Sequence, residues 1–414
     1  MSDSRFHSIV LPNGVTVLGQ EMPSVASATL SILVPIGVAT DKDDFEGAAR
    51  ILGDMFCKGC DGLNSRQLSD KFESLGVHRS HSFGTDSTVF SFSMLGENLI
   101  PAIEIASLML LHPTLPEVEL SSVKSLALQD ILSLEDQPSS KVMVNLAKCL
   151  YPYPFGRSQL GTIKGIEAVN VEHLKNYYQS SFVADRSIIA VAGRFCWDEF
   201  VSCVGKYFGE WQGNSKELKC DTLRDSNFYE HEHQDTAQLQ IALGYPSVSY
   251  DHNDYYVARM GVALLSAGMS GRLFIEVREK RGLVYRVSAS HGATKNRAAV
   301  FGYAGTTPER GQETLDVMLN EFRCIGENIT QDELQRAKAD VKSRLVMQGE
   351  LSSARSSALV NDWWNLSRVR SIDEIKDAID AVNAKDIERY AKEFPACPIT
   401  LVTLGSKKLE VKSL

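Results

Sequence analysis

The chain has 414 residues, of which 43% are hydrophobic and 23% charged, and this composition is typical of a globular protein with two or three domains. Its formal net charge of −9 argues against binding to nucleic acids or to anionic membranes. The first residues lack the basic-then-apolar pattern of a signal peptide, and no apolar run is long enough to span a membrane. We therefore expect a cytoplasmic protein with eight reduced, mostly buried cysteines.

Hydrophobic periodicity predicts mixed helices and strands along the first half. In chain order we expect extended segments near 6–20 and 27–36, helices near 45–57 and 65–75, an extended segment near 78–94, helices near 97–109, 117–134, 139–149 and 171–180, and a strand near 187–193. Residues 213–227, GNSKELKCDTLRDSN, are polar and charged and predict a surface linker. In the second half, Thr330 with Glu333 and Ser371 with Glu374 are capping boxes, and each predicts the start of a helix.

Three sequence patterns recur at a spacing of roughly 210 residues. The helix start AVN at 168–170 returns at 381–383, each time followed by a branched aliphatic residue and a tyrosine on one helical face. The strand SIIAVAG, ending at Gly193, is echoed by ITLVTLG, ending at Gly405. ATLSILV at 28–34 is echoed by AQLQIAL at 237–243. The repeat predicts an α+β protein with two homologous domains from an internal duplication, at 1–212 and 230–414, joined by a linker at 213–229.

Residues 46–60, EGAARILGDMFCKGC, resemble the inverted zinc motif of the pitrilysin and insulinase family of metallopeptidases, to which the mitochondrial processing peptidase belongs. That motif reads Gly-x-Ala-His-x-x-Glu-His-Met, followed by an aromatic residue and Lys-Gly-Thr. Gly47, Ala49, Met55, Lys58 and Gly59 fit the frame. The resemblance extends over both halves and the linker. It implies two antiparallel-rich sheets, each with helices on one face, in domains related by a pseudo-twofold axis.

The metal-binding residues of this motif are replaced. Arg50 stands at the first His, Gly53 at the general-base Glu and Asp54 at the second His, while LQDI at 128–131 places Asp130 at the third ligand. A guanidinium is a permanent cation and repels a metal ion, and glycine has no group to accept a proton. We expect no metal on this chain, and we propose that Arg50 replaces it as the local cation in a cluster with Asp54 and Asp130.

Residues 268–285, GMSGRLFIEVREKRGLVY, closely resemble a second signature of the family. There an Arg and a Tyr seven residues apart reach toward the zinc site, bind the substrate backbone and stabilise the oxyanion, and this implies such roles for Arg278 and Tyr285. A guanidinium and a phenol suit a carbonyl oxygen that gains negative charge. Taken without the resemblance, Arg278 is an exposed helix charge and Tyr285 the start of a strand.

The family also binds peptides along a sheet edge in its first domain, which implies substrate-binding positions at Ser80 and His81, where the family usually has Asn-Ala. His78 and His81 point to opposite faces of a strand and cannot chelate one ion together. Cys57 and Cys60 form a CxxC without a second ligand pair, and the sequence HEH at 231–233 places two imidazoles on one strand face. For both motifs the structural interpretation outweighs a metal site.

Some bacterial members of this family are heterodimers in which one subunit carries the zinc motif and the other the Arg and Tyr. This chain resembles the second kind. We expect a non-catalytic subunit that is active only with a homologous zinc-bearing partner and a peptide substrate, with zinc held by the partner. An inactive scaffold or assembly protein is the alternative. A weaker alternative is an active hydrolase with a metal at Asp54, Asp130 and Cys57.

Overall fold

The computed structural model describes residues 5–220 and 223–411. The described chain forms two compact units, and neither is continuous in sequence. The first unit contains the described residues up to Ser133, together with Arg157–Leu218 and Gln348–Trp364. The second contains Leu134–Gly156, Lys219–Met347 and the described residues from Asn365 onward. Each unit therefore includes a segment from the opposite half of the sequence.

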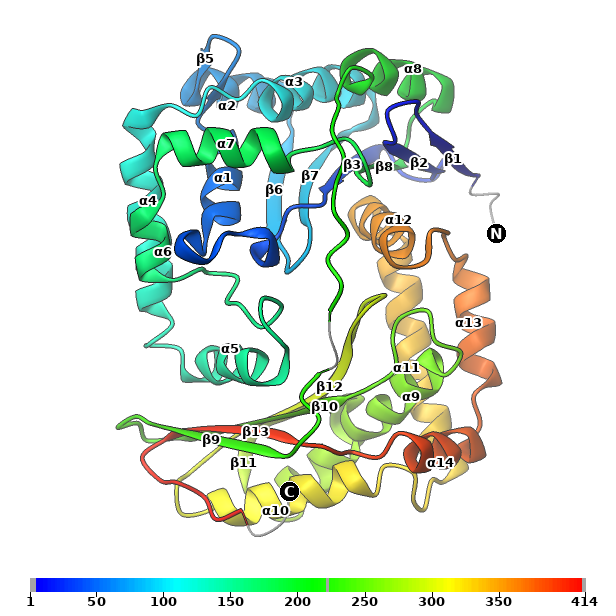
Figure 1. The fold of residues 1–414 in the computed structure, drawn as a ribbon. Coiled ribbons are helices and arrows are strands. Elements are labelled where there is room, and N and C mark those ends of the chain that lie inside the picture. Colours follow the sequence, from blue (N-terminus) through cyan, green and yellow to red (C-terminus); the bar gives the residue numbers. More distant parts are fainter. Residues whose placement is uncertain (1–4, 221–222, 412–414) are drawn as a thin grey trace. The chain divides into compact units, whose positions relative to one another are not determined.

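The first unit is built on a six-stranded sheet with the order β1-β2-β8-β3-β7-β6 (Figure 1). β2 and β8 run parallel, and the other neighbouring strands run antiparallel. The strands are β1 (Phe6–Val10), β2 (Thr16–Glu21), β3 (Ser27–Val34), β6 (His78–Phe83), β7 (Thr88–Leu95) and β8 (Ile188–Gly193).

Two segments that the sequence predicts as single extended stretches are each a pair of antiparallel strands. In the stretch 6–20 the chain turns between β1 and β2, where the Leu11 N–H bonds the Val15 carbonyl and Gly14 takes a φ of +89°. In the stretch 78–94 it turns at 84–87, closed by the Gly84 N–H on the Ser87 carbonyl. Glycine at or beside the turn lets the strand reverse with its alternation intact.

Helices cover one face of the first sheet and enclose its main core. The six helices predicted in the first half are all present, five of them in this unit, and two further helices, α6 and α8, were not predicted. The core includes large, fully buried side chains such as Phe56, Phe72 and Phe200. The helices on this face are α1 (Ala48–Phe56), α2 (Ser65–Ser74), α3 (Leu99–Leu111), α4 (Glu117–Ser133), α6 (Ile163–Ala168), α7 (Val171–Ser181) and α8 (Trp197–Phe208).

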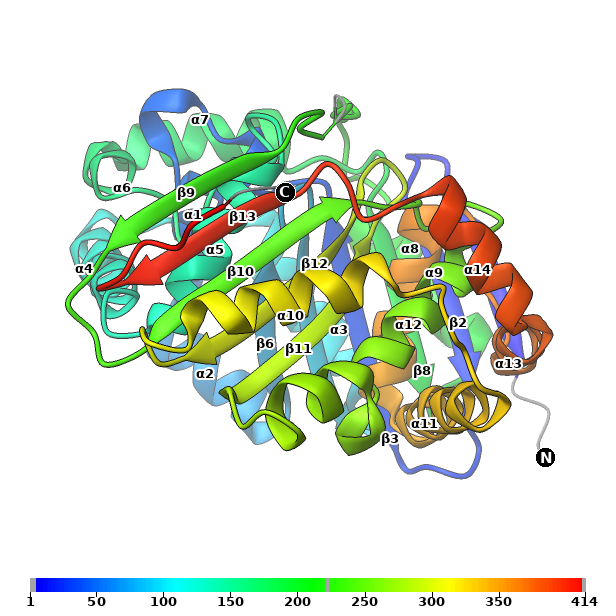
Figure 2. The ribbon, with the colours of Figure 1, turned by 90° about the horizontal axis from the view of Figure 1, so that it is seen from below.

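The second unit repeats this plan on a five-stranded sheet with the order β11-β12-β10-β13-β9. Figure 2 shows these strands side by side, with α10 in front of them. The strands are β9 (Phe228–His233), β10 (Leu239–Pro246), β11 (Val284–Ala293), β12 (Ala298–Thr306) and β13 (Thr400–Gly405). The helices are α5 (Pro138–Leu150), α9 (Tyr255–Ser266), α10 (Gly311–Arg323), α11 (Gln331–Gly349), α13 (Ile372–Ala381) and α14 (Ala384–Glu393), with two short turns, η4 (Gly268–Ser270) and η5 (Phe274–Glu279).

The internal duplication is confirmed by the strand order. The series β2-β8-β3-β7-β6 corresponds to β9-β13-β10-β12-β11, and in each the first pair is parallel. The repeated helix starts are α7 and α14, whose caps Asn170 and Asn383 accept N–H bonds from the first turn. Their tyrosines, Tyr177 and Tyr390, are 5% and 4% exposed, so the same face is buried in both copies. The α+β class with two homologous domains is therefore correct.

One helix from the opposite half of the sequence covers the second face of each sheet. In the second unit, Val142 and Leu146 of α5 pack on Ala242, Val402 and Leu404. In the first unit, α12 (Ser352–Leu366) makes a polar contact instead.

That polar contact consists of three sets of side chains. The Ser352 hydroxyl lies 3.0 Å from that of Thr29, and the Ser356 hydroxyl donates to that of Ser31 at 2.8 Å. The Arg355 Nε donates to the Gln20 amide oxygen at 3.0 Å. Helices therefore lie on both faces of each sheet.

All eight cysteines are free thiols, as expected, but the expectation that most are buried is wrong. Cys60 and Cys203 are buried, four are half-buried, and Cys196 and Cys397 are exposed. Over residues 5–220 and 223–411, none of the helices is both long and apolar enough to cross a membrane.

Candidate functional site

Helix α1 carries the three residues at the zinc-motif positions, and a buried carboxylate holds its first turn. Asp41 accepts the N–H groups of Gly47 and Ala49 at 2.7 and 2.9 Å, and the Tyr177 hydroxyl donates to it at 3.0 Å. Burial raises the pKa of Asp41 to about 6. The sequence analysis missed this residue, because it lies seven residues before the first residue of the helix and outside any capping pattern.

Arg50 and Asp130 form an ion pair between α1 and α4. The guanidinium side chain is 10% exposed and the carboxylate 57% exposed, so a buried cation faces a carboxylate at the surface. The hypothesis of a three-membered cluster is correct for this pair alone. Asp54 does not join it and pairs with another residue.

The partner of Asp54 is His81 on β6, with the Nε2 atom 3.0 Å from the carboxylate oxygen. The hydrogen bond to Asp54, followed by one to the Cys57 thiol, raises the pKa of His81 to about 9. The imidazole is therefore protonated at neutral pH and forms a charged pair. Two side-chain cations, Arg50 and His81, thus stand opposite two carboxylates in this part of the unit.

The place of the general base is filled by an aromatic ring. A Cβ atom added to Gly53 would lie 2.1 Å from the Phe83 ring, well inside van der Waals contact. Phe83 ends strand β6 and also packs edge-on against the His81 ring, with 4.9 Å between centroids. The glycine therefore permits a close contact between α1 and β6. We refer to these side chains together as the α1 cluster: Arg50, Gly53, Asp54, His81, Phe83 and Asp130.

The α1 cluster does not fit zinc. Zinc in proteins is held by three or four neutral imidazoles, thiolates or carboxylates, and here each carboxylate is engaged by a cationic side chain. In the part of the chain that the structure describes, no group of three or more His, Cys, Asp or Glu side chains is arranged to bind a metal ion. The same holds for Cys57 with Cys60 and for HEH at 231–233, where His231 bonds the Thr403 hydroxyl at 2.9 Å.

Strand β6 is an edge strand of the first sheet and carries both predicted substrate-binding positions. Its side chains alternate, with His78, Ser80 and Ser82 exposed and His81 turned toward α1. Ser80 is therefore accessible along the edge, whereas the imidazole of His81 is bonded to Asp54.

Arg278 and Tyr285 lie in the second unit and are both exposed. Arg278 is in η5, where its guanidinium lies 5.0 Å from the centroid of the Phe274 ring. Tyr285 is 85% exposed and occupies a β-bulge, because Val284 pairs with Thr306 while Arg286 pairs with Gly305. A bulge re-aims the extra side chain away from the ladder. Within the described residues neither side chain has a hydrogen bond or an ion pair. We call Arg278 and Tyr285 the Arg/Tyr pair.

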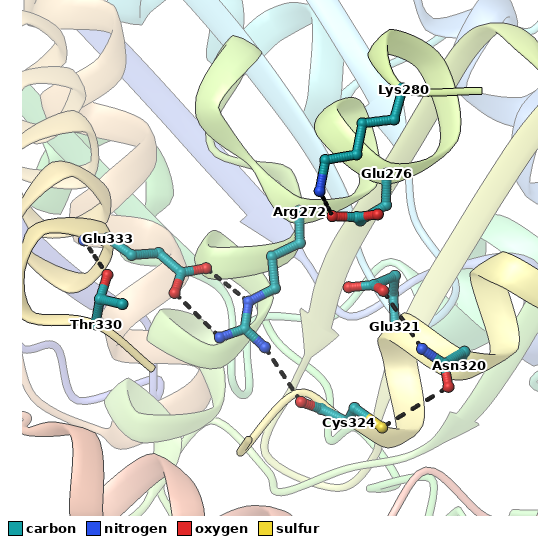
Figure 3. A network of polar contacts seen from close by, with 8 residues as sticks. All are labelled: Arg272, Glu276, Lys280, Asn320, Glu321, Cys324, Thr330 and Glu333. Carbon is teal, nitrogen blue, oxygen red and sulfur yellow. Dashed lines mark hydrogen bonds and ion pairs between the residues drawn. The ribbon is translucent and has the colours of Figure 1, made fainter. Parts of the chain in front are cut away.

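A network of charged contacts anchors the turn that carries Arg278 (Figure 3). The Arg272 Nε and Nη2 atoms donate hydrogen bonds to the Glu333 carboxylate at 2.6 and 3.0 Å. The Nη1 atom donates to the Cys324 carbonyl at the end of α10. Glu276 accepts from Lys280 at 2.6 Å and from Arg281 at 2.8 Å. Two charges of the REKR segment, Lys280 and Arg281, are thus paired with Glu276 close to Arg278.

The same network modifies a predicted capping box. Thr330 caps α11 by accepting the Glu333 N–H at 3.2 Å, as the sequence predicts. The Glu333 side chain pairs with Arg272, so only half of the box is formed for capping. The Glu333 side chain is 14% exposed and the Arg272 side chain 15%, so the pair is largely shielded from solvent.

Comparison with known proteins agrees with this arrangement. The family model "Insulinase (Peptidase family M16)" matches residues 16–163, and the model "Peptidase M16 inactive domain" matches residues 168–341. Together they match most strands of both sheets and more than half of the chain. The chain belongs to peptidase family M16.

Two bacterial relatives match over nearly the whole length. A protein of Rickettsia bellii named "uncharacterized zinc protease" is 25% identical over 98% of both chains. The "uncharacterized zinc protease YmxG" of Bacillus subtilis is also 25% identical, over 92% of this chain and 94% of its own.

Solved structures share the fold. A peptidase M16 inactive domain from Pseudomonas fluorescens superposes with a TM-score of 0.88 at 20% identity, over 98% of this chain and 99% of its own. A protease from Helicobacter pylori superposes with a TM-score of 0.86 at 20% identity, over 97% and 99%.

Proposed function

We propose that this chain is the non-catalytic subunit of a two-subunit zinc peptidase. A homologous subunit with an intact His-x-x-Glu-His motif holds the zinc ion and cleaves the peptide. This chain contributes the Arg/Tyr pair to the enclosed reaction chamber. The observation that carries the proposal is the contrast between the α1 cluster, whose carboxylates are paired with cations, and the exposed Arg/Tyr pair, which has no hydrogen bond or ion pair among the described residues.

The chemistry of the Arg/Tyr pair fits this role. A guanidinium and a phenol are hydrogen-bond donors, and no acceptor among the described residues binds either of them. Both are therefore available for the carbonyl oxygen of a peptide bond. As the tetrahedral species forms, that oxygen gains negative charge, and donors already in place stabilise it. Removal of one such donor typically lowers kcat about 10²–10³-fold.

The test is reconstitution with the zinc-bearing subunit obtained by co-purification from the native source. Arg278→Ala is expected to lower kcat/KM of the complex about 100-fold, and Tyr285→Phe about tenfold or more. Arg336→Ala is the matched control, because Arg336 is an exposed arginine on α11, outside the turn that carries Arg278. It is expected to change activity less than about threefold. Unchanged activity in both Arg278→Ala and Tyr285→Phe, with the complex intact, would support the scaffold alternative.

The isolated chain gives a second test. It is expected to contain no stoichiometric zinc and to cleave no peptide, because the α1 cluster offers neither ligands nor a general base. One equivalent of zinc together with peptidase activity in the isolated chain would contradict the proposal. The cytoplasm is the proposed compartment, since Cys196 and Cys397 are exposed free thiols. Fractionation of the native source tests this.

A further inference from the structure

The two sheets present four edge strands, and one of them is unlike the others. β6, β9 and β11 all carry charged side chains: Arg79 on β6, Glu230 and Glu232 on β9, and Arg286 on β11. Such charges keep free strand edges from pairing with other chains. β1 has the sequence FHSIV, with no Asp, Glu, Lys or Arg. Its only titratable group, His7, is bonded to Glu21 at 3.1 Å.

The backbone of β1 leaves one side free. The Arg5 carbonyl accepts the Glu21 N–H at 3.1 Å, and the Leu11 N–H bonds the Val15 carbonyl at 2.9 Å. Alternate residues of an antiparallel ladder bond the same neighbour, so His7 and Ile9 bond β2. The N–H and C=O groups of Phe6, Ser8 and Val10 then point away from the sheet. β1 is the terminal strand of the sheet, and no backbone bond to this outer side exists within the described residues.

The side chains of β1 are also uncovered. Phe6 is 42% exposed, Ile9 43% and Val10 58%, and these are large apolar groups on a strand of five residues. Phe6 and Val10 lie on the same face, with Ser8 between them. An uncharged apolar edge with free backbone groups is suited to the addition of another strand.

We infer that β1 pairs with β1 of a second copy of this chain, antiparallel and centred on Ser8. In this register Ser8 faces the partner's Ser8, and Phe6 faces the partner's Val10 on both sides of the two-fold axis. All three residues with outward backbone groups on each strand then meet counterparts, which gives six hydrogen bonds. The opposed aromatic and β-branched side chains form a favourable cross-strand pair.

An uncharged apolar strand such as β1 pairs better with a second copy of itself than with a strand that carries charged side chains. The register sets no like charges opposite each other, although the chain as a whole has a net charge of −9 and two copies repel at long range. The same segment serves both copies, as in two-fold interfaces generally. With five residues a side the interface is small, so association is weak, on the order of 10–100 µM. This pairing is independent of the proposed function and of the zinc-bearing subunit.

The first experiment is sedimentation velocity of the full chain from about 1 to 200 µM, a range set by the expected affinity. A reversible monomer–dimer equilibrium is expected. Ser8→Lys places two lysines opposite each other and is expected to weaken the dimer at least about tenfold. Ser122→Lys is the matched control, because Ser122 is exposed on α4, and it is expected to leave the equilibrium unchanged. Wild-type chain that remains monomeric at 200 µM overturns the inference, as does a dimer that Ser8→Lys and Ser122→Lys affect equally.

The second experiment tests the register. In a Cys196→Ser, Cys397→Ser background, which removes the two exposed thiols, Ser8→Cys is expected to form a disulfide-linked dimer under mild oxidation. Val10→Cys is expected to form little, because each cysteine then faces Phe6 of the other copy. Cross-linking that is absent at position 8, or stronger at position 10, contradicts the centred pairing. Circular dichroism verifies that each variant is folded.

Discussion

The α1 cluster and the Arg/Tyr pair differ in what their side chains bind. In the first unit, Arg50 pairs with Asp130 and Asp54 with His81, and a ring covers Gly53. In the second unit, Arg278 and Tyr285 are exposed and have no hydrogen bond within residues 5–220 and 223–411, while Lys280 and Arg281 are paired with Glu276. Groups that have internal partners contribute to stability, and groups held free are available to a ligand. Changes in the α1 cluster should therefore alter stability, and changes in the Arg/Tyr pair should alter activity.

Substitution of Arg272 is expected to lower both stability and activity, and its loss of stability is the largest that we expect. Arg272→Ala removes a bidentate pair and leaves Glu333, 14% exposed, without its cation. We expect the free energy of unfolding to fall by about 3 kcal/mol. Because Arg272 anchors the turn that carries Arg278, activity of the reconstituted complex should fall as well.

Urea denaturation measures the first effect and reconstitution the second. Arg336→Ala is the matched control, since Arg336 is exposed on α11, and its effect should stay within about 0.5 kcal/mol. Equal stability of the Arg272→Ala and Arg336→Ala chains would show that the network in Figure 3 does not support the turn.

Asp130→Ala tests the α1 cluster directly. Arg50 is 8% exposed, and its one side-chain acceptor in the described part of the chain is Asp130, so the variant leaves a buried cation unpaired. The carboxylate is 57% exposed and solvent screens the pair, so we expect a loss of about 2 kcal/mol.

Denaturation with and without a chelator distinguishes stabilisation by the Arg50–Asp130 ion pair from stabilisation by a bound metal ion. Chelation is expected to leave wild-type stability unchanged, and Asp70→Ala, an exposed carboxylate on α2, should change it by less than about 0.5 kcal/mol. Activity per folded Asp130→Ala molecule in the reconstituted complex should equal that of the wild type. A loss of activity without a loss of stability would reverse the assigned roles.

The His81–Asp54 pair predicts a pH dependence of stability. The pKa of His81 rises from 6.5 to about 9 on folding, so the folded state binds the proton more tightly. The stabilisation is complete below about pH 6.5 and is lost as the pH rises through about 9. His81→Gln should therefore lower Tm at pH 6.5 and have little effect at pH 9.5.

His78→Gln is the control for this series, because His78 is exposed on the same strand. Its Tm should follow that of the wild type at each pH. A His81→Gln deficit that is the same at pH 6.5 and 9.5 would assign the loss to packing against Phe83 and not to the ion pair.

Much of this arrangement follows from the sequence, and the rest depends on three-dimensional packing. The duplication and the caps at Asn170 and Asn383 are local patterns, and they predicted the repeated helices and strands. Helix α8 was missed although Phe200, Val204 and Phe208 follow helical spacing, so its signal was present. Local periodicity does not show that α5 packs on the second sheet and α12 on the first. The choice of sheet depends on contacts between residues that are far apart in the sequence.

The α1 cluster shows the same limit at the level of side chains. The i, i+4 spacing suggested that Arg50 pairs with Asp54, but α4 and β6 bring Asp130 and His81 closer to the available groups. The spacing of residues on one helix does not account for acceptors that other elements supply. Phe83, at the end of a strand, likewise gave no sign that it packs on Gly53.

Gly53→Ala gives the smallest expected effect and the one with the most informative sign. Glycine to alanine inside a helix normally stabilises by about 0.5–1 kcal/mol. At Gly53 the new methyl group meets the Phe83 ring at 2.1 Å, so the ring must swing aside and the change should destabilise by about 1 kcal/mol. Gly205→Ala in α8 is the control, because its methyl group meets nothing within 4 Å and should stabilise.

The Gly53→Ala, Phe83→Ala double variant completes the cycle. With the ring removed, alanine at 53 should regain the normal helical preference and become stabilising relative to Phe83→Ala alone. A coupling energy near zero would mean that the ring does not fill the position of the general base. A clear coupling would mean that the Phe83 ring occupies the position of the general base. The contact between this ring and Gly53 then holds α1 against β6.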